Sequence, residues 1–217
     1  MKSKVLLSAA ATVLVALPAA GASAFEAMSL KSNDITYQGH LLVSQQEVDS
    51  AKDFIDSMAK QGIDFLANPD LTLEQRKREF KKLLQSSFDI KTIGRFTMGR
   101  YWGSASEEQK KEFQKLFETM VIDVYSRRFS DYNGQEFEIK SARPEGRADV
   151  IVQSYIVDDN DQKISVDWRV RKKNGSYKVI DIIVEGVSMA TTQRSEFASI
   201  IQRGGGQVDV LIAHLKS

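Results

Sequence analysis

The stretch ISVDWRVRKKNGSYKVIDIIV, Ile164 to Val184, decides the class of fold. Apolar and polar residues alternate along its first eight positions, which is the period of a strand with one buried face and one wet face. Asn174-Gly175 then interrupts the run, and both residues tolerate the positive φ of a tight hairpin turn. The stretch therefore predicts two antiparallel strands. The residues predicted to point into the core from the first strand are Ile164, Val166, Trp168 and Val170.

The neighbouring sequence extends this hairpin into a larger sheet. The period-2 pattern occupies four runs, at about 136–143, 147–157, 163–172 and 177–187. The segments between them, RPEG, DDND and KNGS, have the composition of hairpin connections. The sequence thus predicts a four-stranded antiparallel meander.

The sequence before the sheet is helical. Three S/T-x-x-E/Q motifs, SQQE at 44–47, TLEQ at 72–75 and SEEQ at 106–109, have the form of capping boxes, and each precedes an apolar stripe at helical spacing. After the sheet, two short helices are predicted at about 191–203 and 207–216. A Gly-Gly-Gly step separates them. The fold class expected is α+β, with helices packed on the sheet and two C-terminal helices that close the chain.

The N-terminus has the features of a secretory signal. Lys2 and Lys4 precede an apolar run over 5–17, and ASA at 22–24 is a cleavage site. A membrane anchor would need roughly 18 apolar residues, and this run is shorter. We therefore expect a cleaved signal peptide at 1–24, an extension at 25–43 and one domain at 44–217. The mature protein is expected to be soluble in an exported compartment.

Composition excludes several classes of function. The chain has no cysteine, so disulfides, thiolate catalysis and zinc–thiolate sites are excluded. Loss of Lys2 and Lys4 with the signal peptide would change the formal net charge from +1 to −1. Nothing in that balance indicates a nucleic-acid partner, which would require a basic face.

One segment resembles a catalytic motif. GVSMA at 186–190 follows an apolar strand and precedes a helix, as the nucleophile elbow of a hydrolase does. That elbow belongs to a parallel sheet and needs a histidine near the serine. Here the strands are joined by hairpins, and the histidines are His40 and His214. We interpret Ser188 as part of a structural turn; the alternative is a serine hydrolase that uses Ser188 and His214.

The remaining polar motifs are weaker. Asp181 and Glu185 would lie about 13 Å apart on one strand, too far to share a bond, so we expect them to be solvated or to satisfy nearby backbone groups. GRFTMGR at 94–100 has the glycine spacing of a phosphate loop but lacks the Lys-Ser/Thr that follows in one. DDND at 158–161 lacks the glycine and the glutamate of a calcium loop. We expect no catalytic residue, no metal and no cofactor.

Three further segments resemble a known family. GRYW at 99–102, DIIVEGVS at 181–188 and RSEF at 194–197 occur in this order before a glycine step. In this combination, over roughly residues 48–215, the chain resembles the MlaC family. These are periplasmic phospholipid-binding proteins, also known as toluene-tolerance proteins and as auxiliary components of an ABC transporter.

The resemblance implies a function and a set of partners. The family encloses acyl chains between a curved sheet and helices. It carries phospholipid between an outer-membrane lipoprotein–porin complex and an inner-membrane ABC transporter with its periplasmic lipid-binding subunit, which maintains outer-membrane lipid asymmetry. A monomer is expected. The extension at 25–43 leaves open a hopanoid-associated branch with another lipid, and a structural adaptor with a solid core is a third hypothesis.

Candidate lining residues come from the inward sheet positions and from the wide apolar helix stripe. The sequence does not separate cavity wall from packed core. Trp168 and Tyr125 are the preferred wall residues, because large aromatic side chains can border a cavity without filling it. The full predicted set is Tyr101, Trp102, Met120, Val124, Tyr125, Val150, Val152, Val166, Trp168, Ile180, Ile182 and Val184.

Overall fold

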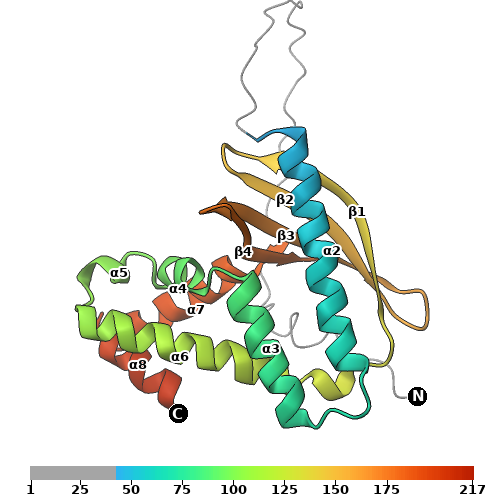
Figure 1. Cartoon of the computed structure of the whole chain (residues 1–217). Coiled ribbons are helices and arrows are strands. Elements are labelled where there is room, and N and C mark those ends of the chain that lie inside the picture. Colours follow the sequence, from blue (N-terminus) through green and yellow to red (C-terminus); the bar gives the residue numbers. More distant parts are fainter. Residues whose placement is uncertain (1–42) are drawn as a thin grey trace, which may run out of the picture. The chain divides into compact units, whose positions relative to one another are not determined.

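A computed structural model describes residues 43–217, and element labels follow Figure 1. The predicted signal peptide, 1–24, and the extension up to residue 42 lie outside the described residues. Among residues 43–217, none of the helices combines the length and the hydrophobicity needed to span a bilayer.

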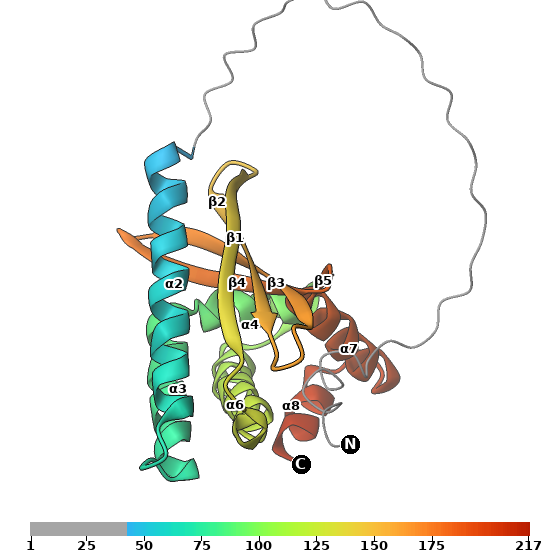
Figure 2. The ribbon, with the colours of Figure 1, turned by 90° about the vertical axis from the view of Figure 1, so that its right-hand side faces the viewer.

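The helical part begins with two long helices that lie side by side, α2 (Gln45–Ala67) and α3 (Leu73–Ser87) (Figures 1 and 2). Two shorter helices follow, α4 (Ile90–Met98) and α5 (Tyr101–Ser104), and then the long α6 (Glu107–Ser126). All three predicted capping boxes are confirmed, since the N-cap side chain and the N3 side chain bond each other's backbone N–H at the starts of α2, α3 and α6.

The sheet is antiparallel throughout, with its strands in chain order. A short 3₁₀ turn, η1 (Phe129–Asp131), leads from α6 into it. The predicted Asn174-Gly175 turn is confirmed, because both residues have positive φ, 50° and 80°. The strands are β1 (Glu136–Glu145), β2 (Asp149–Val157), β3 (Lys163–Lys173), β4 (Ser176–Val184) and β5 (Val187–Ser188).

The strand count is therefore five rather than the predicted four. The prediction of one strand over 177–187 is wrong because Glu185 and Gly186 adopt positive φ, 49° and 78°, and reverse the chain. The two residues that follow, Val187 and Ser188, pair back onto β4. The reversal brings the chain to the start of α7 (Met189–Arg203).

Two irregularities bend the sheet. The β1–β2 register shifts between Ile139 and Ser141, and the β3–β4 register shifts so that Ile180 has no partner on β3. Such bulges increase the local twist and bend the strand that carries them. The bends give the sheet the curvature visible in Figure 2, with α2 across its apolar face.

The described residues form two separate hydrophobic clusters. In the sheet cluster, α2 packs on the sheet. Its buried members are Val43, Val48, Ala51, Ile55, Met58, Val150, Val152, Val170 and Val179. The helical cluster joins α4, α5, α6, α7 and α8 (Val208–Lys216). Its buried members are Met98, Tyr101, Ala105, Phe113, Phe117, Phe197, Ile201, Val208, Leu211 and Ile212.

Candidate functional site

Trp168 stands on the apolar face of the sheet with its polar atom already bonded. Its indole N–H donates to the Ser154 hydroxyl at 3.0 Å, and that hydroxyl donates to the Val166 carbonyl at 2.7 Å. The ring of Phe137 meets the indole edge to face, with centroids 6.2 Å apart. The indole is only partly buried. The indole is therefore held in place and exposes apolar surface, and its hydrogen-bond donor is already satisfied.

The C-terminal half of α6 carries large apolar side chains that the protein does not cover. Val124 is 51% exposed and Tyr125 is 45% exposed. The Tyr125 ring lies 6.4 Å from the ring of Phe80 on α3, and Phe80 in turn meets Phe129 at 5.3 Å. Burial raises the pKa of the Tyr125 hydroxyl. Part of the Tyr125 side chain is therefore covered by its neighbours, and part of it stays exposed.

The exposure of Val124 and Tyr125 follows from how α6 is held. Its main packing partners are α3, α4 and α8, and the strands are not among them. Its buried residues, Phe113, Phe117 and Ile122, anchor the helix in the interior. The apolar stripe of α6 is wider than those contacts need, so Val124 and Tyr125 remain uncovered. We use the term apolar recess for the surface of Val124, Tyr125 and Phe80.

Ser188 is a helix cap. Its hydroxyl accepts from the Thr191 backbone N–H at 3.1 Å and donates to the Asp181 carboxylate at 2.6 Å. His214 lies exposed on α8, and no hydrogen bond joins it to Ser188 in the described residues. His40 lies outside them. The interpretation of this motif as a structural turn is confirmed at the level of geometry.

The carboxylates on β4 and in the turn after it also serve the backbone. Asp181 accepts from the Ala190 N–H at 3.0 Å, and Glu185 accepts from the Ser165 N–H at 2.5 Å. The expectation that they satisfy nearby backbone groups is confirmed. Within residues 43–217, no three acidic or histidine side chains converge in a way that could hold a metal ion.

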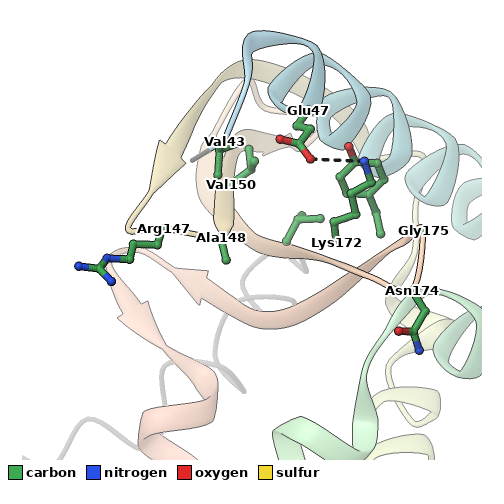
Figure 3. Close-up of a pocket in the computed structure, with 10 residues that line it drawn as sticks. Val43, Glu47, Arg147, Ala148, Val150, Lys172, Asn174 and Gly175 are labelled. Carbon is green, nitrogen blue, oxygen red and sulfur yellow. Dashed lines mark hydrogen bonds and ion pairs between the residues drawn. The ribbon is translucent and has the colours of Figure 1, made fainter. Parts of the chain in front are cut away.

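Two open grooves flank the β3–β4 turn, and Asn174 lines both. The first, of about 340 Å³, lies between the start of α2 and the two hairpin turns, and the Lys172–Glu47 ion pair crosses it at 3.3 Å (Figure 3). The second, of about 630 Å³, lies among α3, α4, α6 and the hairpin and is lined by Lys91, Lys115, Lys173 and Lys178. Charged side chains line both grooves.

Comparison with known proteins decides the family. The sequence model of the family described as MlaC protein matches residues 56–217. The chain belongs to the MlaC family. The resemblance predicted from GRYW, DIIVEGVS and RSEF is thereby confirmed.

Named relatives share part of their length with this MlaC-family chain. It is 26% identical over 132 residues to the intermembrane phospholipid transport system binding protein MlaC of Haemophilus influenzae, covering 59% of this chain and 61% of that protein. It is 26% identical over 113 residues to the toluene tolerance protein ttg2D of Pseudomonas putida, covering 52% and 53%. The chain thus spans less than two thirds of either relative.

A solved structure shares the fold more completely. The phospholipid-binding protein of Ralstonia solanacearum, solved in complex with a phospholipid, matches with a TM-score of 0.67 and 26% identity. The match covers 76% of this chain and 94% of that protein. The predicted α+β class, with helices on a curved antiparallel sheet, is confirmed.

The predicted lining residues of this MlaC-family chain fall into three groups. Tyr101, Trp102 and Met120 pack in or against the helical cluster. Val150, Val152 and Val166 are buried on the sheet, each 5% exposed or less. The residues that keep accessible surface outside the helical cluster are Val124, Tyr125, Trp168, Ile180, Ile182 and Val184.

Sequence reasoning missed several residues near this surface. Phe80, Phe129 and Phe137 were not predicted to border it. The Phe80 ring contacts Tyr125 and Phe129, and the Phe137 ring contacts Trp168. Phe80 belongs to the apolar stripe of α3, so the helical period marked it as buried. The period gave no signal of which helix it faces.

Proposed function

We propose that this chain is a periplasmic phospholipid carrier that makes and breaks no covalent bond. The observation that carries the proposal is the apolar recess, where Val124 and Tyr125 are about half exposed beside the aromatic ring of Phe80. Exposed apolar surface of this kind is unfavourable in water, and contiguous apolar patches often mark ligand-binding sites. The proteins from Haemophilus and Ralstonia named above support the choice of phospholipid as that ligand.

Carriage by enclosure follows from the energetics of the cargo. The two chains of a diacyl lipid contain about 30 methylenes at ~0.8 kcal/mol each, so leaving a bilayer for water costs on the order of 24 kcal/mol. A carrier must offset most of that cost with apolar surface. We propose that the sheet face around Trp168 and Ile182 faces the same acyl chains as Tyr125.

The proposed route runs between an outer-membrane lipoprotein–porin complex and an inner-membrane ABC transporter, with this chain acting as a monomer that maintains outer-membrane lipid asymmetry. Hand-off between donor and acceptor requires comparable affinities at each step. Because the carrier itself supplies no chemical energy in this scheme, direction is imposed by the partners. The Ser188 cap, with its hydroxyl engaged by Asp181, gives no support to hydrolysis.

The test places a charge in the apolar recess. Val124→Asp would set an unpaired carboxylate among acyl chains, at a cost of several kcal/mol, so we expect lipid loading to fall at least about a hundredfold. Val187→Asp is the matched control, because Val187 is 38% exposed on β5 and outside the recess. Both proteins are purified gently, and the extracted lipid is measured by mass spectrometry per mole of protein.

Thermal unfolding of the delipidated proteins separates loss of cargo from loss of fold. We expect both variants to melt within a few degrees of the unchanged protein. Stoichiometric phospholipid on Val124→Asp would contradict the assignment of the recess. A hopanoid on the unchanged protein would change the cargo, and a folded protein that refuses every lipid would favour the structural adaptor.

A further inference from the structure

A stacked arginine marks the surface where α4 meets α7. The Arg194 guanidinium lies 5.1 Å from the centroid of the Phe96 ring. Gly99 ends α4 with φ 55°, and a Cβ built there would lie 2.7 Å from Arg194 Nε. The missing Cβ of this glycine therefore leaves the space that the Arg194 guanidinium occupies. Stacking restricts the guanidinium, so less conformational entropy is lost when its N–H groups bind an acceptor.

The surface around this stack is cationic and has no ion pairs. Arg95, Arg100 and Arg194 are all exposed, and none has a carboxylate within ion-pair distance in residues 43–217. Arg100 instead donates to the Tyr101 hydroxyl at 2.9 Å. The nearby Glu196 accepts from Gln193 on its own helix. We use the term arginine patch for Arg95, Phe96, Arg100 and Arg194.

Phe96 is the apolar point of the patch. It is 41% exposed, although burial of a phenylalanine side chain is energetically favourable. The other large apolar residues that are similarly exposed in the described residues, Leu73, Val124, Tyr125 and Val187, lie on other elements. One isolated aromatic is too little for the apolar centre of a standard protein interface, which buries about 800 Å² per partner.

We propose that the arginine patch docks the protein on a membrane surface rich in anionic phospholipid. Guanidinium groups bind phosphate oxygens in bidentate geometry, and cationic residues around an aromatic tip suit the headgroup layer. Negative surface potential attracts each unpaired arginine, and Phe96 enters the acyl boundary. The patch lies on α4, on α7 and at Arg100, the residue before α5, whereas the apolar recess lies on α3 and α6, so docking and cargo binding use different residues.

The test is sedimentation of the full mature protein with vesicles. We expect binding to vesicles of phosphatidylglycerol mixed with phosphatidylcholine, weak binding to phosphatidylcholine alone, and binding that weakens without disappearing as salt rises. Arg194→Ala should weaken binding about fivefold, and Arg95→Ala with Arg194→Ala about twentyfold. Arg194→Lys keeps the charge without the planar stack and should fall between. Phe96→Ser should weaken the binding that persists at high salt.

The control is Arg203→Ala, which removes an exposed arginine from the opposite side of α7, nine residues along. We expect it to bind vesicles as the unchanged protein does. Lipid cargo is measured on each variant, and retention of cargo by Arg194→Ala separates this proposal from that of the carrier. Equal binding by Arg194→Ala and Arg203→Ala would overturn docking through the patch. Absence of vesicle binding, together with protection of the α4 and α7 amides from hydrogen exchange by polyglutamate, would also overturn membrane docking. That result would favour an acidic protein partner.

Discussion

The outer face of the sheet contains a buried carboxylate that two arginines hold. Asp149 opens β2 with 3% of its side chain exposed, and it accepts from Arg169 Nε at 2.7 Å and from Arg171 Nε at 2.6 Å. Arg171 lies directly opposite Asp149 in the ladder. The two arginine side chains are 40% and 43% exposed. This difference in exposure predicts that the two signs of charge are not equally costly to remove.

Replacing both arginines with alanine leaves a buried carboxylate without a partner. That loss costs ~3–5 kcal/mol and should lower the melting temperature by roughly 8–16 °C. Asp149→Ala instead leaves two arginines that can turn into water, and should cost only ~1–3 kcal/mol. The triple variant, which removes all three groups, should be more stable than the double arginine variant.

The pH dependence has a defined sign. Burial raises the pKa of Asp149, but the hydrogen bonds from Arg171 and Arg169 outweigh it, so the pKa lies below its ordinary value. The stabilisation is therefore present above the unfolded pKa of ~3.9 and is lost as pH falls through the folded pKa. In the double arginine variant burial acts alone and raises the pKa of Asp149. Protonation then relieves the penalty, and the stability gap to the unchanged protein should narrow from pH 7 towards pH 4.

Urea unfolding at pH 7 and pH 4 measures these differences as shifts of the urea midpoint, provided that the m-value stays constant. Equal instability of Asp149→Ala and the double arginine variant at pH 7 would contradict the predicted asymmetry between the two signs of charge. A stability gap that does not change with pH would contradict the predicted rise in the pKa of Asp149.

Three smaller perturbations test other contacts. Ser188→Ala removes a helix cap worth ~1 kcal/mol, so we expect a melting temperature a few degrees lower with lipid binding unchanged; loss of lipid transfer from a folded variant would count against the structural role. Gly204→Ala would place a Cβ 2.5 Å from Val210 Cγ2, so it should destabilise by ~1–3 kcal/mol, and Val210→Ala should restore part of that in calorimetry. Trp168→Phe leaves the Ser154 hydroxyl without its donor and should cost ~1 kcal/mol in urea titrations, whereas an unchanged midpoint would mean that the bond is not formed in solution.

Local chemistry explains which parts of the fold could be predicted. The capping boxes and the Asn174-Gly175 turn depend on residues a few positions apart, so a short window contains all the information. The break between α4 and α5 depends on Gly99, which adopts positive φ and whose missing Cβ leaves room for an arginine almost a hundred residues away. The bulge at Ile180 was hidden because Val179 and Ile180 are both apolar, so a one-residue shift leaves the hydrophobic pattern intact.

The candidate site shows the same limit. Periodicity marked Tyr101 and Tyr125 alike as apolar helix positions, but Tyr101 is 9% exposed and Tyr125 is 45% exposed. The difference depends on whether another element packs there, which a single sequence does not encode locally. The preference for Trp168 and Tyr125 rested on side-chain size. Their role as cavity wall stays a prediction until cargo is measured.

The helical cluster is assembled from two stretches of chain that the entire sheet separates. Phe113 and Phe117 come before the sheet, Phe197 comes after it, and the three rings meet within 6.2 Å of one another. Contacts of such sequence separation form late, because a long loop must close first. A growing or translocating chain therefore cannot complete this cluster until α7 and α8 have emerged. Truncation of the last thirty or so residues should trap a partly folded chain with exposed phenylalanines, which is a substrate for chaperones and proteases.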